Sequence, residues 1–325
     1  MANYPQLDDC SGVWTLKEVN DAVMGGYWRS YGSRAIAAGG STPSNSDVID
    51  FGIMATTGNF ADFGDLTVAR KALGGCSNII RGLAGGGQVP SDSNVIDYWT
   101  MASTGNAADF GDRTEAKREV GGCSNSTRGL FAGAQPGSAT IDYVNIMATG
   151  NATDFGDLTS ARSQQCAPCS SPTRALFAGG YPSSTVIDYV EIATTGNAVD
   201  FGDLISAETY MTGASSSTRG TWAGGQTPAT KNDIQYVTIA SLGNAIDYGD
   251  LAVVRALGGG TSNSIRALAM GGYTPSLSNP IDYWNINNGG TASDFGDLTV
   301  ARADGIAGMS QAHGGLNEGY QGTRP

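Results

Sequence analysis

The chain has 325 residues, 48 of them glycine, with 40% hydrophobic and 15% charged residues. Its apolar runs are too short for long helices or for a membrane-spanning segment, so we expect an all-β protein without membrane insertion. The formal net charge of -12 comes without a basic cluster, which disfavours nucleic acid and anionic membranes as partners because nothing would neutralise phosphates. Seventeen of the 30 acidic residues belong to two repeated motifs, so we assign most of the negative charge to the structure of the repeat and not to a cationic partner.

The first predicted element is a short amphipathic helix in a leader of residues 1–26. Thr15 and Glu18 fit a T-x-x-E capping box, apolar residues at 16, 19 and 23 would share one face, and two glycines at 25 and 26 end the pattern. Two interpretations stay open. The helix packs against the domain that follows, or, with Trp14 as its anchor, it attaches the chain to a partner.

The rest of the chain is a tandem repeat with a period of 45 to 47 residues. The hexapeptide D-F-G-D-L-T, or a close variant, occurs six times. Its second aspartate is Asp65, Asp112, Asp157, Asp203, Asp250 and Asp297. An arginine recurs at the same spacing, as Arg34, Arg81, Arg128, Arg174, Arg219 and Arg266.

Each period predicts four short strands. In the fourth copy, residues 174–178 form an apolar run that ends in a glycine pair, residues 186–194 are rich in β-branched and aromatic residues, and a strand begins at 203 after a Gly-Asn turn. A fourth strand comes from the G-G-C-S-N segment, as at 121–125. Four antiparallel strands in about 45 residues match one propeller blade, so residues 27–315 are predicted to form a six-bladed β-propeller.

The ends of the repeat indicate how the ring closes. The first copy lacks the G-G-x-S-N strand before Arg34, whereas a surplus segment, 305–315, follows the last copy. We predict that this C-terminal segment supplies the missing strand of the first blade, because the exchange removes both exposed sheet edges. Residues 316–325 form a polar tail.

Repeated charges predict a structural network. A basic residue lies five residues after the second aspartate in every copy except the fourth, where Glu208 stands. We expect charge-assisted pairs within this spacing, namely Asp65 with Arg70, Asp157 with Arg162 and Asp297 with Arg302. Calcium binding by the D-x-G-D carboxylates stays open as an alternative.

Repeated aromatic and small residues are assigned to the core. The aromatic residue inside each D-x-G-D motif would fill the gap between blades. Cys76, Cys123 and Cys169 occupy a position that also holds alanine and threonine, which indicates a small buried side chain.

Two tryptophans are the candidate ligand contacts. Trp99 and Trp284 follow the I-D-Y motif at a position that holds valine in other copies, and we interpret this variation as a sign of surface exposure. Exposed tryptophans stack on sugar rings. The variable loops after the glycine pairs, at 88–93, 181–184 and 226–231, offer a further contact surface.

No catalytic, metal or cofactor site is predicted. The C-x-x-C at 166–169 has no second pair, and His313 is the single histidine. The departures from the repeat consensus do not combine into an acid–base or nucleophile pattern. We therefore expect a non-enzymatic protein.

The element R-x-x-x-x-G-G-x-S, followed by T-R-[AG]-L-F-A-G-G and I-D-Y, resembles the kelch type of β-propeller repeat, although the tryptophan usual later in a kelch repeat is absent. The version T-G-N-A-x-D-F-G-D-L-T-x-A-R looks more like repeats in structural and tail-associated proteins of marine tailed bacteriophages. The opening from Gly12 to Trp28 resembles leaders in the same group.

This resemblance implies a structural or adhesion component of a virion, present in many copies and in contact with other virion proteins or a host-surface glycan. The alternative is a lectin-like propeller, in which mutation of Trp99 or Trp284 would weaken multivalent sugar binding.

Overall fold

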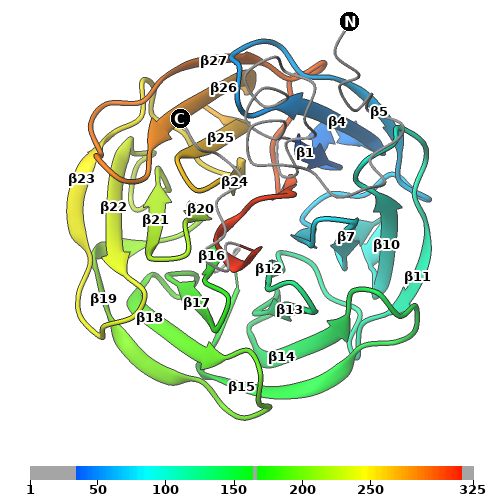
Figure 1. Cartoon of the computed structure of the whole chain (residues 1–325), viewed down its shortest axis with the longest axis horizontal. Coiled ribbons are helices and arrows are strands. Elements are labelled where there is room, and N and C mark those ends of the chain that lie inside the picture. Colours follow the sequence, from blue (N-terminus) through cyan, green and yellow to red (C-terminus); the bar gives the residue numbers. More distant parts are fainter. Residues whose placement is uncertain (1–33, 164–166, 317–325) are drawn as a thin grey trace, which may run out of the picture. The chain divides into compact units, whose positions relative to one another are not determined.

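The computed structural model of the protein describes residues 34–163 and 167–316. The predicted leader helix with Trp14 and all but the first residue of the predicted tail lie outside these residues. The described chain forms six four-stranded antiparallel sheets arranged around a central axis, as Figure 1 shows. This arrangement confirms the predicted six-bladed β-propeller. No helix among the described residues is long and apolar enough to span a membrane.

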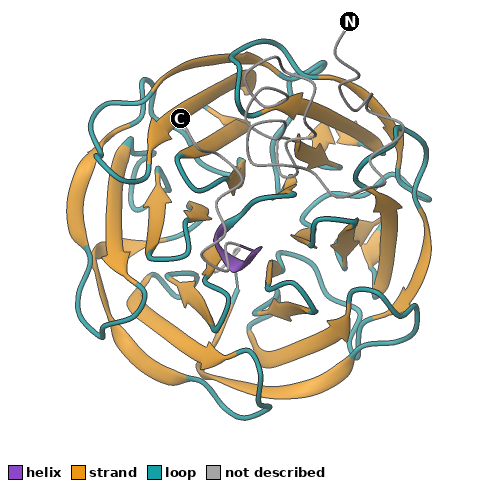
Figure 2. Ribbon diagram, in the orientation of Figure 1, coloured by secondary structure: helices purple, strands orange, loops and turns teal. Residues whose placement is uncertain are grey.

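Five blades are built from continuous segments, with the first strand next to the axis and the fourth at the rim (Figure 2). Their strands are β6 (Gly74–Ser77), β7 (Arg81–Gly85), β10 (Val95–Thr100) and β11 (Ala108–Asp112) in blade 2; β12 (Gly121–Ser124), β13 (Arg128–Ala132), β14 (Ser138–Asn145) and β15 (Thr153–Arg162) in blade 3; β16 (Ala167–Ser170), β17 (Arg174–Ala178), β18 (Ser184–Glu191) and β19 (Val199–Glu208) in blade 4; β20 (Thr212–Ser215), β21 (Arg219–Ala223), β22 (Asp233–Thr238) and β23 (Ile246–Asp250) in blade 5; and β24 (Gly259–Ser262), β25 (Arg266–Tyr273), β26 (Leu277–Asn285) and β27 (Ser293–Asp297) in blade 6.

Blade 1 joins the two ends of the described chain. It contains β1 (Arg34–Ala38), β4 (Val48–Ile53) and β5 (Ala61–Asp65), and its innermost strand is the C-terminal β28 (Ala307–Ser310). Strand β28 pairs antiparallel with β1, with Ala35 opposite Ser310 and Ala38 opposite Ala307. The predicted strand exchange is therefore confirmed. The remaining elements are the two-stranded hairpins β2 (Ser41–Thr42)–β3 (Ser44–Asn45) and β8 (Gln88–Val89)–β9 (Ser91–Asp92), and a 3-10 turn, η1 (Gly314–Leu316).

The hydrophobic core lies between blades. Phe63 of blade 1 is buried in one cluster with Trp99 and Met101 of blade 2, and each of the other clusters likewise combines two neighbouring blades. The aromatic residue of D-x-G-D thus fills the gap between blades, as predicted. Cys76, Cys123 and Cys169 are also buried, in agreement with the predicted small core position.

Five blade interfaces contain a buried arginine–aspartate pair. The guanidinium of Arg70, which follows blade 1, lies 2.7 Å from the carboxylate of Asp97 in blade 2, and both side chains are almost fully buried. Asp97 also accepts hydrogen bonds from the backbone and hydroxyl of Thr67. The five pairs are Arg70–Asp97, Arg113–Asp142, Arg162–Asp188, Arg255–Asp282 and Arg302–Asp50. We call them the interblade latches.

The latches correct the predicted pairing. Arg70, Arg162 and Arg302 do form ion pairs, but their partner is the aspartate of the next blade's I-D-[FY] motif, whereas the expected partners were Asp65, Asp157 and Asp297. The physical reason lies in the strand order. The arginine lies at or just after the end of the outermost strand of its blade. The buried carboxylate within its reach is therefore the one on the third strand of the next blade. At the interface between blades 2 and 3, Arg113 supplies the charge, although the repeat spacing pointed to Lys117.

The interface between blades 4 and 5 replaces both partners of the latch. Glu208 stands at the arginine position and Gln235 at the aspartate position. Glu208 forms an ion pair with Lys231, and the amide oxygen of Gln235 accepts a hydrogen bond of 2.9 Å from the backbone N–H of Ile205. Each of the two substituted side chains thus has a polar partner of its own.

The rim of each blade is held by the loop that follows the next blade's third strand. The N–H of Ala107 donates to the carbonyl of Asp65, and the side-chain oxygen of Asn106 accepts from the N–H of the same aspartate. At Gly64, where φ is 147°, a Cβ would lie 2.5 Å from the carbonyl of Gly105. This close approach explains why the motif carries a glycine between its two aspartates.

Candidate functional site

The face of the propeller that carries the loops between second and third strands is the candidate site. Each loop begins after a glycine pair, or after Gly133-Ala134 in blade 3, and each contains a proline. The first loop residue is bonded to the linker that enters the same blade. These pairings are Ser41 with Ala303, Gln88 with Lys71, Gln135 with Arg118, Tyr181 with Ser163 and Tyr273 with Ala256, while the N–H of Gln226 donates to the carbonyl of Thr209. We call these six first residues the collar.

Two tyrosines are the outstanding exposed groups of the collar. Tyr181 is 55% exposed and Tyr273 is 42% exposed, and every other aromatic side chain that the structure describes is buried or half-buried. They belong to blades 4 and 6, and the equivalent residue of the intervening blade 5 is the exposed Gln226.

The linkers that enter the blades bring some of their polar and charged side chains together. Five linkers carry a non-glycine residue with a positive φ at the same repeat position: Ala72, Glu119, Tyr210, Leu257 and Asp304. The hydroxyl of Tyr210 hydrogen-bonds to the carboxylate of Glu119, although the two residues belong to different linkers. Burial raises the pKa of Tyr210 above its ordinary value, and the nearby charges of Glu119 and Asp304 raise it further. The tyrosine therefore stays protonated and acts as a hydrogen-bond donor.

Three basic side chains on this face, those of Lys71, Arg118 and Lys231, are paired with carboxylates. Lys71 lies 2.5 Å from Asp304, and Arg118 lies 2.8 Å from Asp92. Lys231 is paired with the buried Glu208. These pairs leave the loop face without a concentrated positive charge, even though three of its linkers and loops carry basic residues.

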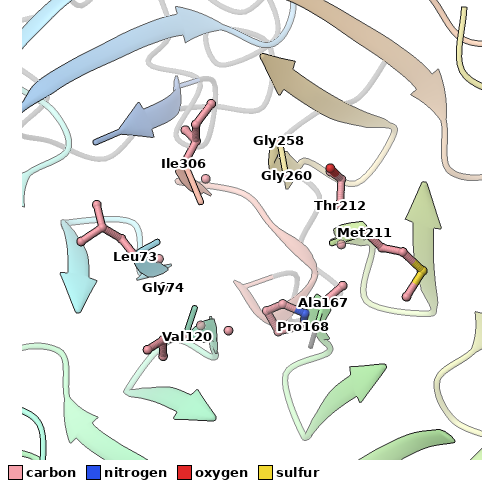
Figure 3. A pocket seen from close by; sticks show the side chains of 15 residues that line it. Leu73, Gly74, Val120, Ala167, Pro168, Met211, Thr212, Gly258, Gly260 and Ile306 are labelled. Carbon is pink, nitrogen blue, oxygen red and sulfur yellow. The ribbon is translucent and has the colours of Figure 1, made fainter. Parts of the chain in front are cut away.

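A small cavity of about 60 Å³ lies on the axis. Figure 3 shows side chains such as Leu73, Val120, Met211 and Ile306 around it. Most of the remaining lining is glycine backbone, because the inner strands converge: a Cβ at Gly75 would lie 3.0 Å from the carbonyl of Gly308. The channel is consequently narrow.

A ring of serines closes the channel toward the opposite face. Each inner strand ends in a buried serine, and each hydroxyl donates to the backbone carbonyl of the preceding blade's serine, with lengths of 2.5 to 2.8 Å. The ring consists of Ser77, Ser124, Ser170, Ser215, Ser262 and Ser310. We call it the serine ring.

The single histidine binds beside the serine ring. Nε2–H of His313 donates to the carbonyl of Ser77 over 2.8 Å, and Nδ1 accepts from the N–H of Gly315 over 3.2 Å. Burial lowers the pKa of His313 to about 4, so the ring is neutral at pH 7. Ser124 lies 3.3 Å from Nε2, but its hydroxyl also donates to the carbonyl of Ser77. This geometry holds the imidazole in place and does not direct it to activate the serine.

The structure corrects the predicted sugar-stacking residues. Trp99 and Trp284 are only 3% and 2% exposed and pack between blades, so neither offers a ring face to a ligand. Trp99 packs closely against the strand beside it, since a Cβ at Gly82 would lie 2.7 Å from its Nε1. Trp14, the third candidate, lies outside the described residues.

Sequence reasoning did not single out the two exposed tyrosines, although Tyr181 begins the loop 181–184 that it named. The available signal was the exchange of serine, glutamine and tyrosine at one repeat position directly after the glycine pair, where a loop begins. A contact role for the loops 88–93, 181–184 and 226–231 stays a prediction. Among the described residues, no group of three or more His, Cys, Asp or Glu side chains is arranged to hold a metal ion.

The fold and its six sequence repeats define the chain as a β-propeller repeat protein. No protein-family model matches the sequence, and no curated protein is significantly similar to it.

Proposed function

We propose that the protein is a non-enzymatic structural or adhesion component of a tailed phage virion, with the kelch-like propeller as a rigid body and the collar face as its contact surface. The virion assignment is supported by the resemblance of the T-G-N-A-x-D-F-G-D-L-T-x-A-R repeat to virion proteins of marine phages. The chain would be present in several copies and would contact other virion proteins or a host surface.

The observation that carries this proposal is the anchoring of the loop face. In all six blades the first loop residue is bonded to a linker backbone, and at five interfaces a buried latch fixes the neighbouring blades. Loops held in this way lose little conformational entropy when they bind. A surface of this kind suits attachment by many weak contacts.

The residues that line the cavity on the axis also agree better with a contact role than with a catalytic role. The cavity is lined by aliphatic side chains and glycine backbone, which supply neither a general base nor an activated nucleophile. His313 and Ser124, the pair that most resembles catalytic chemistry, both donate to one carbonyl.

Immunogold electron microscopy of a producing culture tests the virion assignment. An antibody raised against the purified propeller should label phage particles, and the labelled position separates tail from capsid. A strain that lacks the coding sequence is the matched control. Label on cells or in the soluble fraction, with none on particles, would overturn the assignment.

A further inference from the structure

The two exposed tyrosines of the collar lie where a ligand would reach them. An exposed tyrosine ring offers a flat apolar surface with a polar edge, and it has few rotatable bonds to immobilise on binding. Tyr181 and Tyr273 occupy the same position in blades 4 and 6, so both rings start from equivalent points of the fold. The other collar positions carry hydrogen-bonding groups, namely Ser41, Gln88, Gln135 and Gln226.

The backbone of each tyrosine is held by two reciprocal hydrogen bonds to the linker of its own blade. The N–H of Tyr181 donates to the carbonyl of Ser163 over 2.8 Å, and the N–H of Ser163 donates back over 3.0 Å. Tyr273 and Ala256 form the same reciprocal pair, at 2.8 and 3.3 Å. The backbone positions from which the two rings project are therefore set before any ligand binds.

The loops of blades 4 and 5 carry hydroxyl groups. Ser183 of blade 4 and Thr227 of blade 5 hydrogen-bond to each other across the blade boundary, at 3.4 Å. Lys231, the basic residue of these two loops, is paired with Glu208. An anionic ligand would find no concentrated positive charge on this face.

We propose that Tyr181 and Tyr273 stack on sugar rings of an uncharged polysaccharide, with Gln226 and the loop hydroxyls as hydrogen-bond partners. Sugars combine apolar ring faces with hydroxyl groups, and the collar presents complementary groups of both kinds. The inference rests on the proposed function, because it names the ligand class of the same contact face. It replaces the tryptophan-based site with one on exposed residues.

Binding to printed glycans tests this site directly. The probes are neutral hexose and N-acetylhexosamine oligosaccharides, printed beside sialylated and sulfated ones, and any bound glycan is then titrated in solution. Tyr181→Ala and Tyr273→Ala should each raise Kd about tenfold, which corresponds to ~1.4 kcal/mol. Tyr181→Phe and Tyr273→Phe retain the ring and should bind as the parent does.

Leu242→Ala is the matched control, because Leu242 is exposed in a loop of the opposite face. Circular dichroism establishes that each variant is folded. The proposal is overturned if the folded parent binds no neutral glycan, if it binds only anionic glycans, or if both alanine variants bind as the parent does. Particle labelling without glycan binding would leave the virion role in place and point to a protein partner for the collar, whereas glycan binding without particle labelling would remove the virion role alone.

Discussion

Removal of one latch carboxylate should destabilise the propeller strongly. Asp188 is fully buried and accepts hydrogen bonds from Arg162 and from both the backbone and hydroxyl of Thr159. Asp188→Ala leaves the buried guanidinium of Arg162 without its counter-charge. Loss of one partner from a buried ion pair costs about 3–5 kcal/mol, so we expect a decrease of that size in the free energy of unfolding.

Asp157→Ala is the matched control, because Asp157 lies in the same strand as Arg162, the partner of Asp188. Asp157 is exposed, and its backbone amide, which the substitution retains, donates to Asn197. Its loss should change the free energy of unfolding by less than about 0.5 kcal/mol. The double variant Arg162→Met with Asp188→Leu removes both charges and should recover most of the loss, because replacement of a buried pair by apolar groups is often close to neutral.

Equilibrium urea unfolding, followed by tryptophan fluorescence and circular dichroism, measures these differences. Similar free energies for Asp188→Ala and Asp157→Ala would refute the latch as a stabilising element. So would a double variant that is less stable than Asp188→Ala, because the uncompensated charge would then not be the cause.

Three further predictions concern other features. Gly156→Ala should cost more than about 1 kcal/mol, because φ is 146° and a Cβ would collide with the carbonyl of Gly196, whereas Gly196→Ala, with nothing within 4 Å of its Cβ, should be nearly neutral in the same urea assay. The single histidine should titrate in proton NMR near its lowered pKa of about 4; since burial disfavours its charged form, stability should fall as the pH drops from about 6.5 through 4, and a titration near 6.5 would contradict the burial of His313. A chain that ends at Ile306 lacks β28 and should lose cooperative unfolding, whereas Met309→Ala keeps the strand and should cost about 2–5 kcal/mol; an unchanged midpoint for the truncated chain would disprove the role of the closing strand.

The fold could be predicted because the sequence repeat determines the number of blades and the strands of each blade. Six copies of one motif at constant spacing fix the number of blades, and the missing strand before Arg34 together with the surplus segment after the last copy fixes the closure. Each inference needs only the order of residues along the chain. Burial of Phe63 and of the repeated cysteines followed from the same regularity.

The partners of the arginines could not be read from spacing within one repeat. Arg70 is five residues from Asp65 in sequence, but the latch joins it to Asp97 in the next blade. The signal that was overlooked is the paired exception: the copy that carries Glu208 is followed by the copy that carries Gln235. When two successive repeats both depart from the consensus, at the arginine position in one and at the aspartate position in the next, these two positions are indicated to lie at the same blade interface.

Trp99 and Trp284 were wrongly expected at the surface because variation was taken as a sign of exposure. The position of Trp99 varies between tryptophan and valine, yet Val144 and Val190 are buried there as well, so this variation occurs within the core. Tyr181 and Tyr273 lie at a position where no packing constraint applies. Sequence alone does not separate these two causes of variation, since both replace a large residue with a small one.

The closure of blade 1 by β28 has a consequence for biosynthesis. Strand β1 leaves the ribosome about 270 residues before the strand that pairs with its inner edge. At 5–20 residues per second, the edge waits roughly 15–55 s for its partner. Five complete blades can form in this interval, yet the first one cannot. The nascent chain thus carries an unpaired β edge through most of its translation, and many copies made on one messenger would expose the same edge to each other until each chain is released.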